Sequence, residues 1–160
     1  MRAFVLSTTL GLGLGCVANP HGDQSSAVAA FQAQVPDFKW DQSTSIKVDI
    51  NADGVPDTAM LGYSEQAAAV GVILGPPSAD PKVLDLQFPF VGNDQFSTCG
   101  RPKGLRVHPT SEGPMEALGV YPEGYRICAR CVEMEVIGGD CDPLMFFWNH
   151  KANTLDWWRA

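Results

Sequence analysis

The sequence predicts a mainly β protein, built as a small antiparallel sheet or sandwich with one short N-terminal helix. Short apolar or alternating runs recur along the chain, and 16 glycines and 12 prolines separate them within 160 residues. Charged residues make up only 18% of the chain and hydrophobic residues 45%, which is typical of a compact fold and not of a disordered chain. A chain of this length can bury a core in a single domain.

The first residues, 1–15, have the composition of a secretory signal peptide. One positive charge precedes an apolar run that is too short for a membrane-spanning helix, which needs about 20 apolar residues. The run ends in GLGC, residues 13–16, which resembles the bacterial lipobox, although Gly13 stands where that motif usually has leucine. The resemblance implies that Cys16 is lipidated and anchors the protein to a membrane. The alternative is ordinary cleavage, for instance after Ala18, which releases a soluble protein.

The mature chain divides into a tether and one domain. Residues 16–26 are predicted to form the tether, because the part before Ser26 is polar and contains Pro and Gly. Residues 27–160 are predicted to form a single β-rich calcium-binding domain. Its first element is a short helix over AVAAFQAQV, residues 27–35, with Ser26 as the N-cap and Pro36 as the stop.

The remaining segments are predicted as strands because they alternate apolar and polar residues or form short apolar runs between turn residues. They are SIKVDI (45–50), TAMLGY (58–63), AVGVILG (69–75), VLDLQF (83–88), YRICAR (125–130), VEMEVI (132–137), MFFWN (145–149) and TLDWWR (154–159). The turn HKAN, residues 150–153, is expected to join the last two strands as a hairpin. Aromatic residues occur on both faces of this hairpin. We expect one face to join the core and the other to be covered by the helix or to bind a partner.

The cysteines predict two disulfides. Without Cys16 the chain has an even number of cysteines for an oxidising compartment, namely Cys99, Cys128, Cys131 and Cys141. Three connectivities are open, and we favour pairing Cys128 and Cys131 each with one of the outer two, because a bridge between them closes a very tight loop. A CxxC redox centre is disfavoured by the strand-like segment after Cys131, and a zinc site by the isolation of Cys99 and Cys141.

The segment DINADGVPD, residues 49–57, has the spacing of a loop that binds a hard cation. Oxygen donors at alternating positions can converge on one ion, and Gly54 permits the sharp turn that this requires. The candidate ligands are Asp49, Asn51, Asp53, Val55 through its backbone carbonyl, and Asp57. An EF-hand is disfavoured, because its position 12 is a bidentate glutamate and Met60 stands there.

This segment resembles the calcium loops of FG-GAP and VCBS β-propeller repeats, which read Asp-x-Asn/Asp-x-Asp-Gly-x-x-Asp, often with proline before the last aspartate. Pro56 and Asp57 are in register with that pattern. The resemblance covers only VDINADGVPDTAML, residues 48–61, and a propeller needs several blades. It therefore implies one strand, loop and strand unit that holds one Ca²⁺ within a different small β-rich domain. The alternative is an Asx-rich turn without metal.

Charge and motif content exclude other classes of function. With 11 basic and 18 acidic residues and a net charge of -7, the chain lacks the basic surface of a nucleic-acid binder. No catalytic motif surrounds the histidines at 21, 108 and 150. Glu133 and Glu135 share one face of their strand and could form an acid/base pair, but this alternation is explained more simply by the solvated side of a half-buried strand. We expect no enzyme.

The sequence also contains a basic segment that is a candidate for contacts with a partner. RPKGLR, residues 101–106, is a basic segment predicted as an exposed loop that contacts an acidic protein surface or lipid headgroups, or is simply solvated. Together the predictions describe an exported, lipid-anchored, calcium-binding and non-enzymatic module on the periplasmic side of a bacterial envelope. It would bind a protein partner, as inhibitors and immunity proteins do. The alternatives are a structural envelope component and a calcium-dependent hydrolase.

Overall fold

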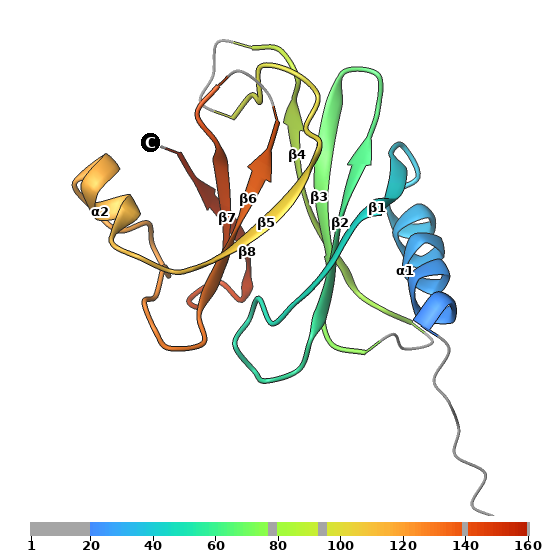
Figure 1. Cartoon of the computed structure of the whole chain (residues 1–160), viewed down its shortest axis with the longest axis horizontal. Helices are drawn as coiled ribbons and strands as arrows, with labels where there is room; N and C mark the ends of the chain where they lie inside the picture. The colour runs from blue at the N-terminus through green and yellow to red at the C-terminus, as the bar shows by residue number, and fades with distance from the viewer. Residues whose placement is uncertain (1–19, 77–79, 93–95, 139–140, 160) are drawn as a thin grey trace, which may run out of the picture.

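The computed structural model describes residues 20–76, 80–92, 96–138 and 141–159. It is a β-sandwich of two four-stranded antiparallel sheets, with a helix on one side (Figure 1). Strand order follows the chain in both sheets, so that each sheet is a simple meander. The predicted mainly β class, with an antiparallel sandwich and an N-terminal helix, is confirmed.

The first sheet contains β1 (Lys39–Val48), β2 (Asp57–Tyr63), β3 (Ala67–Ile73) and β4 (Val83–Pro89). The second contains β5 (Gly104–Pro109), β6 (Val132–Ile137), β7 (Leu144–Asn149) and β8 (Thr154–Trp158). Helix α1 (Pro20–Gln34) precedes the first sheet, and the short helix α2 (Gly113–Leu118) lies between β5 and β6.

One hydrophobic core fills the space between the sheets. Successive side chains of a strand point to opposite faces, so alternate residues of each strand reach this core. Val70 and Val72 of β3 face inward from the first sheet, and Phe146 of β7 faces inward from the second. The rings of Phe88 and Phe146 meet across the sandwich with their centroids 5.6 Å apart. The aromatic hairpin of β7 and β8 therefore contributes one face to the core, as expected.

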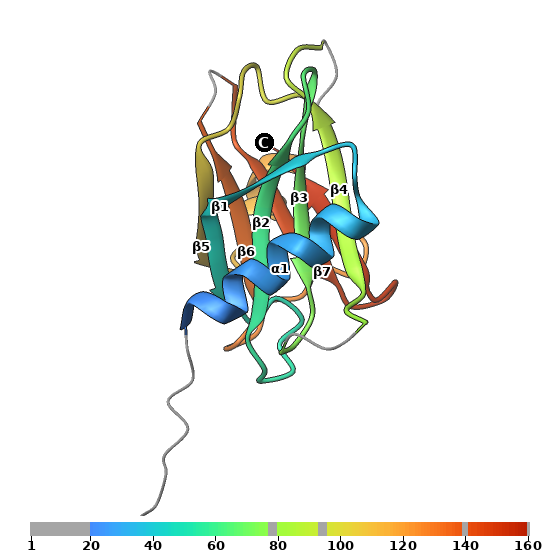
Figure 2. The same cartoon turned by 90° about the vertical axis from the view of Figure 1, so that its right-hand side faces the viewer.

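Helix α1 covers the outer face of the first sheet (Figure 2). Phe31 is fully buried there and stacks on Trp40 of β1, with ring centroids 4.5 Å apart. Gly71 makes this close packing possible, because a Cβ atom at that position would lie 2.6 Å from both the Phe31 and Trp40 rings. The helix thus packs on the first sheet and does not cover the second face of the aromatic hairpin, which was one of the two alternatives expected for that face.

The N-terminal helix begins earlier than predicted. It starts at Pro20 and not after Ser26, so the second half of the predicted tether, residues 20–26, is helical. Proline is favoured in the first turn of a helix, because the backbone N–H groups of that turn make no intrahelical hydrogen bond and proline lacks this group. The predicted signal peptide and the lipidation site at Cys16 lie outside the described residues. Within the described ranges, no helix is long and apolar enough to cross a membrane.

Two segments in the second half of the chain differ from the sequence-based prediction. YRICAR, residues 125–130, is not a strand but part of an irregular excursion. RPKGLR is not an exposed loop throughout, because its second half enters β5. Only Leu105 is buried along β5, since this strand lies at the sheet edge and shows little alternation. The hairpin turn at 150–153 is confirmed, with Asn149 paired to Thr154 across it.

Candidate functional site

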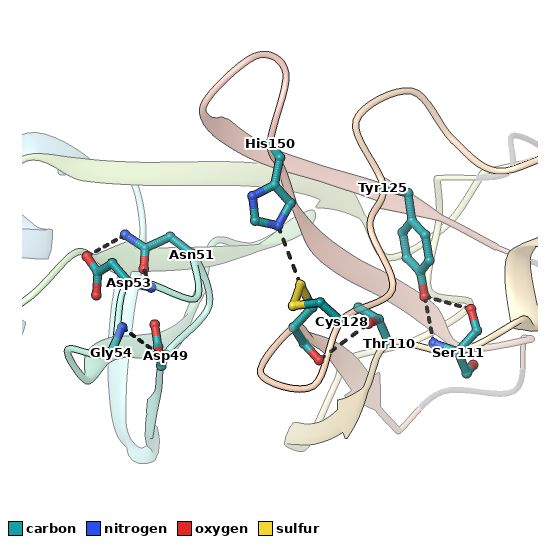
Figure 3. The surroundings of a disulfide bond; sticks show 10 residues. Asp49, Asn51, Asp53, Gly54, Thr110, Ser111, Tyr125, Cys128 and His150 are labelled. Atoms are coloured by element: carbon teal, nitrogen blue, oxygen red, sulfur yellow. Dashed lines mark hydrogen bonds between the residues drawn. A yellow bond between two sulfur atoms is a disulfide. The ribbon is translucent and has the colours of Figure 1, made fainter.

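The loop predicted to bind calcium connects β1 to β2 and is shaped by its own side chains (Figure 3). The carboxylate of Asp49 accepts a hydrogen bond from the Gly54 amide at 2.9 Å. Asn51 Oδ1 accepts from the Asp53 amide at 3.1 Å, and Asp53 Oδ1 accepts from the Val55 amide at 2.7 Å. Gly54 has a φ of 90°, a conformation that favours glycine. The bonds of Asn51 and Asp53 form consecutive Asx turns, and the bond of Asp49 spans them.

Asp57 closes the base of this loop. It is fully buried, and its two oxygens accept hydrogen bonds from the Ile50 amide at 2.9 Å and the Gly75 amide at 2.7 Å. Burial raises the pKa of this carboxyl, while the two backbone hydrogen bonds lower it in part. Asp57 therefore ties the loop to the end of β3, and an ion at this position would share oxygens that already accept backbone hydrogen bonds.

The donor set of the loop suits a hard cation better than a soft one. All its candidate ligands are oxygens, and Asp49 Oδ1 is buried without a hydrogen-bond partner. An orphaned carboxylate oxygen is costly unless a cation or a donor reaches it. In the described part of the chain, however, no group of three or more His, Cys, Asp or Glu side chains is arranged to hold a metal ion. The ligand set Asp49, Asn51, Asp53, Val55 and Asp57 stays a prediction.

The cysteines form two disulfides, but not in the connectivity that we favoured from the sequence. Cys99 pairs with Cys141, and Cys128 pairs with Cys131. The expectation that Cys128 and Cys131 would each bond to an outer cysteine is wrong. The chain between these two residues folds into a tight turn, in which the Cys131 amide donates to the Cys128 carbonyl at 3.1 Å and the Cα atoms lie 5.0 Å apart. Cys99 and Cys141 meet through the packing of the loops that follow β4 and β6.

The short disulfide lies at the base of an excursion between β5 and β6, residues 110–131, which we call the arm. Figure 1 shows the arm and its helix α2 projecting from the second sheet, on the side of the sandwich opposite α1. The Thr110 amide donates to the Cys131 carbonyl at 3.1 Å and brings the two ends of the arm together. The His150 amide donates to the Gly124 carbonyl at 3.0 Å, which ties the arm to the β7–β8 turn. The arm is therefore braced at its base and along its length.

The arm exposes apolar side chains. Seven large hydrophobic residues are exposed among those that the structure describes, and four of them lie on the arm: Met115, Leu118, Val120 and Ile127. Val120 has the largest exposed fraction of the four, 59%. This surface was not predicted from the sequence, because the stretch is rich in Pro and Gly. The available signal was the run of Met115, Leu118 and Val120 outside any predicted strand.

A cleft of about 520 Å³ opens between the start of the arm and the outer face of the second sheet. Met145, Pro143 and Trp158 form apolar parts of its lining, and His108, Glu133 and Glu135 line it with polar groups. The expectation that Glu133 lies on a solvated face is wrong, because only 3% of this residue is exposed.

Glu133 is held by donors from two other elements. Its Oε2 accepts hydrogen bonds from the Tyr125 hydroxyl of the arm and from Trp158 Nε1 of β8, both at 3.0 Å. Burial raises the pKa of the Glu133 carboxyl, and the bonds from Trp158 and Tyr125 lower it in part. Burial also raises the pKa of Tyr125, which keeps its hydroxyl protonated as a donor.

Glu135 has a different environment. Its Oε2 lies 2.7 Å from His108 Nε2 and 3.3 Å from Arg106 Nη1, both on the neighbouring β5. The basic side chains of β5 are therefore directed to Glu135. His150 does not line the cleft. Its Nε2 lies 3.8 Å from Cys131 Sγ (Figure 3), and burial lowers the pKa of His150.

Comparison of the chain with protein-family models, with curated proteins and with solved structures finds no match. The function proposed below is argued from the residues of this chain.

Proposed function

We propose that the protein is an exported, lipid-anchored module that binds a protein partner on the periplasmic side of a bacterial envelope, holds one Ca²⁺ and is not an enzyme. The observation that carries the proposal is the exposed apolar surface of the arm. Large exposed apolar patches on soluble proteins mark interaction sites, and the arm carries four of the seven exposed large hydrophobic side chains among the described residues.

The bracing of the arm supports a binding role. A surface that is already ordered loses little conformational entropy when a partner docks, so more of the contact energy appears as affinity. The Cys128–Cys131 disulfide and the hydrogen bond between Thr110 and Cys131 fix the base of the arm. Stacking of Tyr121 on Tyr125, with centroids 5.9 Å apart, stiffens its interior.

The charges on the arm indicate what partner would fit. The acids Glu112 and Glu116 lie next to Met115 and Leu118 on the arm, whereas the third acid of the arm, Glu123, is paired with Lys151, and Arg126 and Arg130 lie further along it. Complementary charge steers association and selects among partners. We therefore expect an apolar patch with a basic rim on the partner.

The proposed Ca²⁺ would bind in a loop that lies beside the base of the arm. Arg130, at the base of the arm, places Nη1 3.2 Å from the position of a Cβ atom built on Gly54 of the loop. The acidic loop and the arm are thus in contact. An ion held by the oxygens of Asp49, Asn51 and Asp53 would stiffen the loop against which Arg130 rests. The orphaned Asp49 Oδ1 supports this placement of the ion.

The binding proposal is tested by capture from envelope extract with the mature domain, the double variant Met115→Ser/Leu118→Ser and the control Val91→Ser. Val91 is 86% exposed and lies outside the arm, so its replacement controls for general loss of surface hydrophobicity. We expect one stoichiometric protein to be captured by the parent and by the control and lost with the arm variant. Equal capture by all three proteins would contradict a role for the arm.

The calcium and anchor proposals have separate tests. Asp53→Ala should remove the part of the thermal stability that a chelator also removes, and equal melting of both proteins with and without calcium would reject the site. Cys16→Ser should move the protein from the membrane to the soluble fraction. Unchanged fractionation would reject the anchor.

A further inference from the structure

The cleft on the outer face of the second sheet contains a buried carboxylate that forms no salt bridge among the described residues. Glu133 is 3% exposed, and both of its hydrogen bonds come from the neutral donors Tyr125 and Trp158. Among the ion pairs of the described residues, Arg106 and His108 are paired with Glu135, and His108 acts on Glu133 only through its charge, without a salt bridge to it. Buried charges in proteins are normally paired, so an ionised Glu133 calls for a cation.

Only one of the two carboxylate oxygens of Glu133 accepts the hydrogen bonds from Tyr125 and Trp158. Tyr125 and Trp158 both donate to Oε2, so Oε1 is the oxygen of Glu133 that a ligand in the cleft can approach. The cleft is lined by Glu133 itself and has a volume of about 520 Å³, which accommodates an organic group and not only an ion.

The walls of the cleft indicate which cation would fit. Trp158, Met145 and Pro143 are apolar and line the cleft beside the carboxylate. An alkyl stem that ends in a charged nitrogen can lie along such a wall while its head reaches the acid, as lysine and arginine side chains do. An indole ring also attracts a cation that lies over its face. A bare metal ion would find only two carboxylates here, one of them already paired.

We propose that this cleft binds an organic cation, the ammonium or guanidinium head of a lysine, arginine or polyamine type of ligand, with Glu133 as its counter-ion. The site does not depend on the calcium loop, on the lipid anchor or on the apolar surface of the arm. An experiment that disproves this cation site would therefore leave the proposed function untouched, and the reverse also holds.

The test is an NMR titration of the mature domain with butylammonium, butylguanidinium and the neutral analogue 1-butanol. The indole Nε1–H resonance of Trp158, assigned with Trp158→Phe, is the readout because that N–H bonds to Glu133. We expect saturable shifts with the two cations and at least tenfold weaker binding of 1-butanol. Equal binding of the alcohol would overturn the proposal without any variant.

Two variants localise the site. Glu133→Gln keeps the shape of the side chain and removes its charge, so cation affinity should fall at least tenfold. Glu116→Gln, an exposed acid on the arm, is the matched control and should bind like the parent. Unchanged binding by a folded Glu133→Gln protein would overturn the assignment. A tripeptide with a central lysine and spermidine then distinguish the source: the tighter ligand identifies a polypeptide side chain or a free polyamine.

Discussion

The two disulfides differ in how much they constrain the unfolded chain, and this difference can be measured. Cys99 and Cys141 are 42 positions apart in sequence, whereas Cys128 and Cys131 are 3 apart. A disulfide stabilises mainly by reducing the entropy of the unfolded chain, and the effect grows with the logarithm of the loop length. Removal of the long bridge should therefore destabilise the protein more than removal of the short one.

The loop-entropy relation gives the magnitudes. It assigns about 4 kcal/mol to the loop closed by Cys99 and Cys141, and about 2 kcal/mol to the loop closed by Cys128 and Cys131. The comparison uses two double variants, Cys99→Ala/Cys141→Ala and Cys128→Ala/Cys131→Ala. Alanine is chosen because Cys131 is buried and serine would place a hydroxyl there.

Urea unfolding of both double variants is the assay. With a urea dependence of about 2 kcal/mol per molar, the two midpoints should lie roughly 1 M apart, with the variant that lacks the long bridge unfolding first. Equal losses would refute the reasoning. If Cys128 and Cys131 were each bonded to an outer cysteine, either double variant would break both bridges and leave two free thiols. A thiol titration of the unfolded variants, expected to find no thiol apart from that of Cys16 where this residue is present and unlipidated, checks this alternative directly.

Four further substitutions test the packing of the fold and the buried carboxylate of Glu133. Gly71→Ala should cost about 1–3 kcal/mol, because its Cβ would lie 2.6 Å from two rings, and Gly62→Ala should cost less, since its nearest contacts are at 3.0 Å; equal losses in urea unfolding would contradict this. Phe31→Ala should cost about 3–5 kcal/mol, because this ring of α1 is fully buried against the first sheet, and a loss below 1 kcal/mol would show that α1 does not need this contact. Glu133→Gln should raise stability at neutral pH. Burial raises the folded-state pKa of Glu133 above the ordinary value of 4.5, so its protonated form favours folding below pH 4.5 and this contribution is lost as the pH rises through the folded-state pKa. The advantage of the variant should therefore vanish below pH 4.5, and a pH-independent difference in denaturation would contradict the assignment.

The central strands could be predicted from the sequence because they are buried along their whole length. Every residue of β2 and of β7 is buried, and both appear in the sequence as unbroken or nearly unbroken apolar runs. The turn between β7 and β8 was likewise recognisable from HKAN. For these elements local composition and tertiary environment agree, which is the condition under which sequence patterns predict strands reliably.

The edge strand and the arm could not be predicted in the same way. β5 has one buried residue, Leu105, and is held as a strand by its backbone pairing to β6. YRICAR contains strand-forming residues, but the turn between Cys128 and Cys131 and the bond from Tyr125 to Glu133 hold it in an irregular path. Both outcomes depend on partners that lie elsewhere in the chain, so the local pattern does not contain them.

The residues of the candidate site could also be predicted only in part from the sequence. Spacing alone placed Asp49, Asn51 and Asp53 in one loop, because all three lie within a few residues of each other. The alternation of β6 also placed Glu133 and Glu135 on one face correctly. What spacing could not supply was the cover over that face, since Trp158 is 25 positions from Glu133 and reaches it only through the pairing of three strands.

The outer faces of the two sheets explain why the arm and the cleft occur together. On the first sheet, α1 covers the outer face with the packed rings of Phe31 and Trp40. On the second sheet, the arm covers Phe147 through Tyr125, with ring centroids 5.1 Å apart. The carboxylates of β6 lie on the same face, where Tyr125 and Trp158 hold the buried Glu133, and Glu135 lines the cleft beside His108. A strand face that no helix covers can retain such charged groups. A ligand in the cleft would contact the arm at Thr110 and Ser111. A cation in the cleft and a protein partner docked on the exposed apolar side chains would therefore both contact the arm.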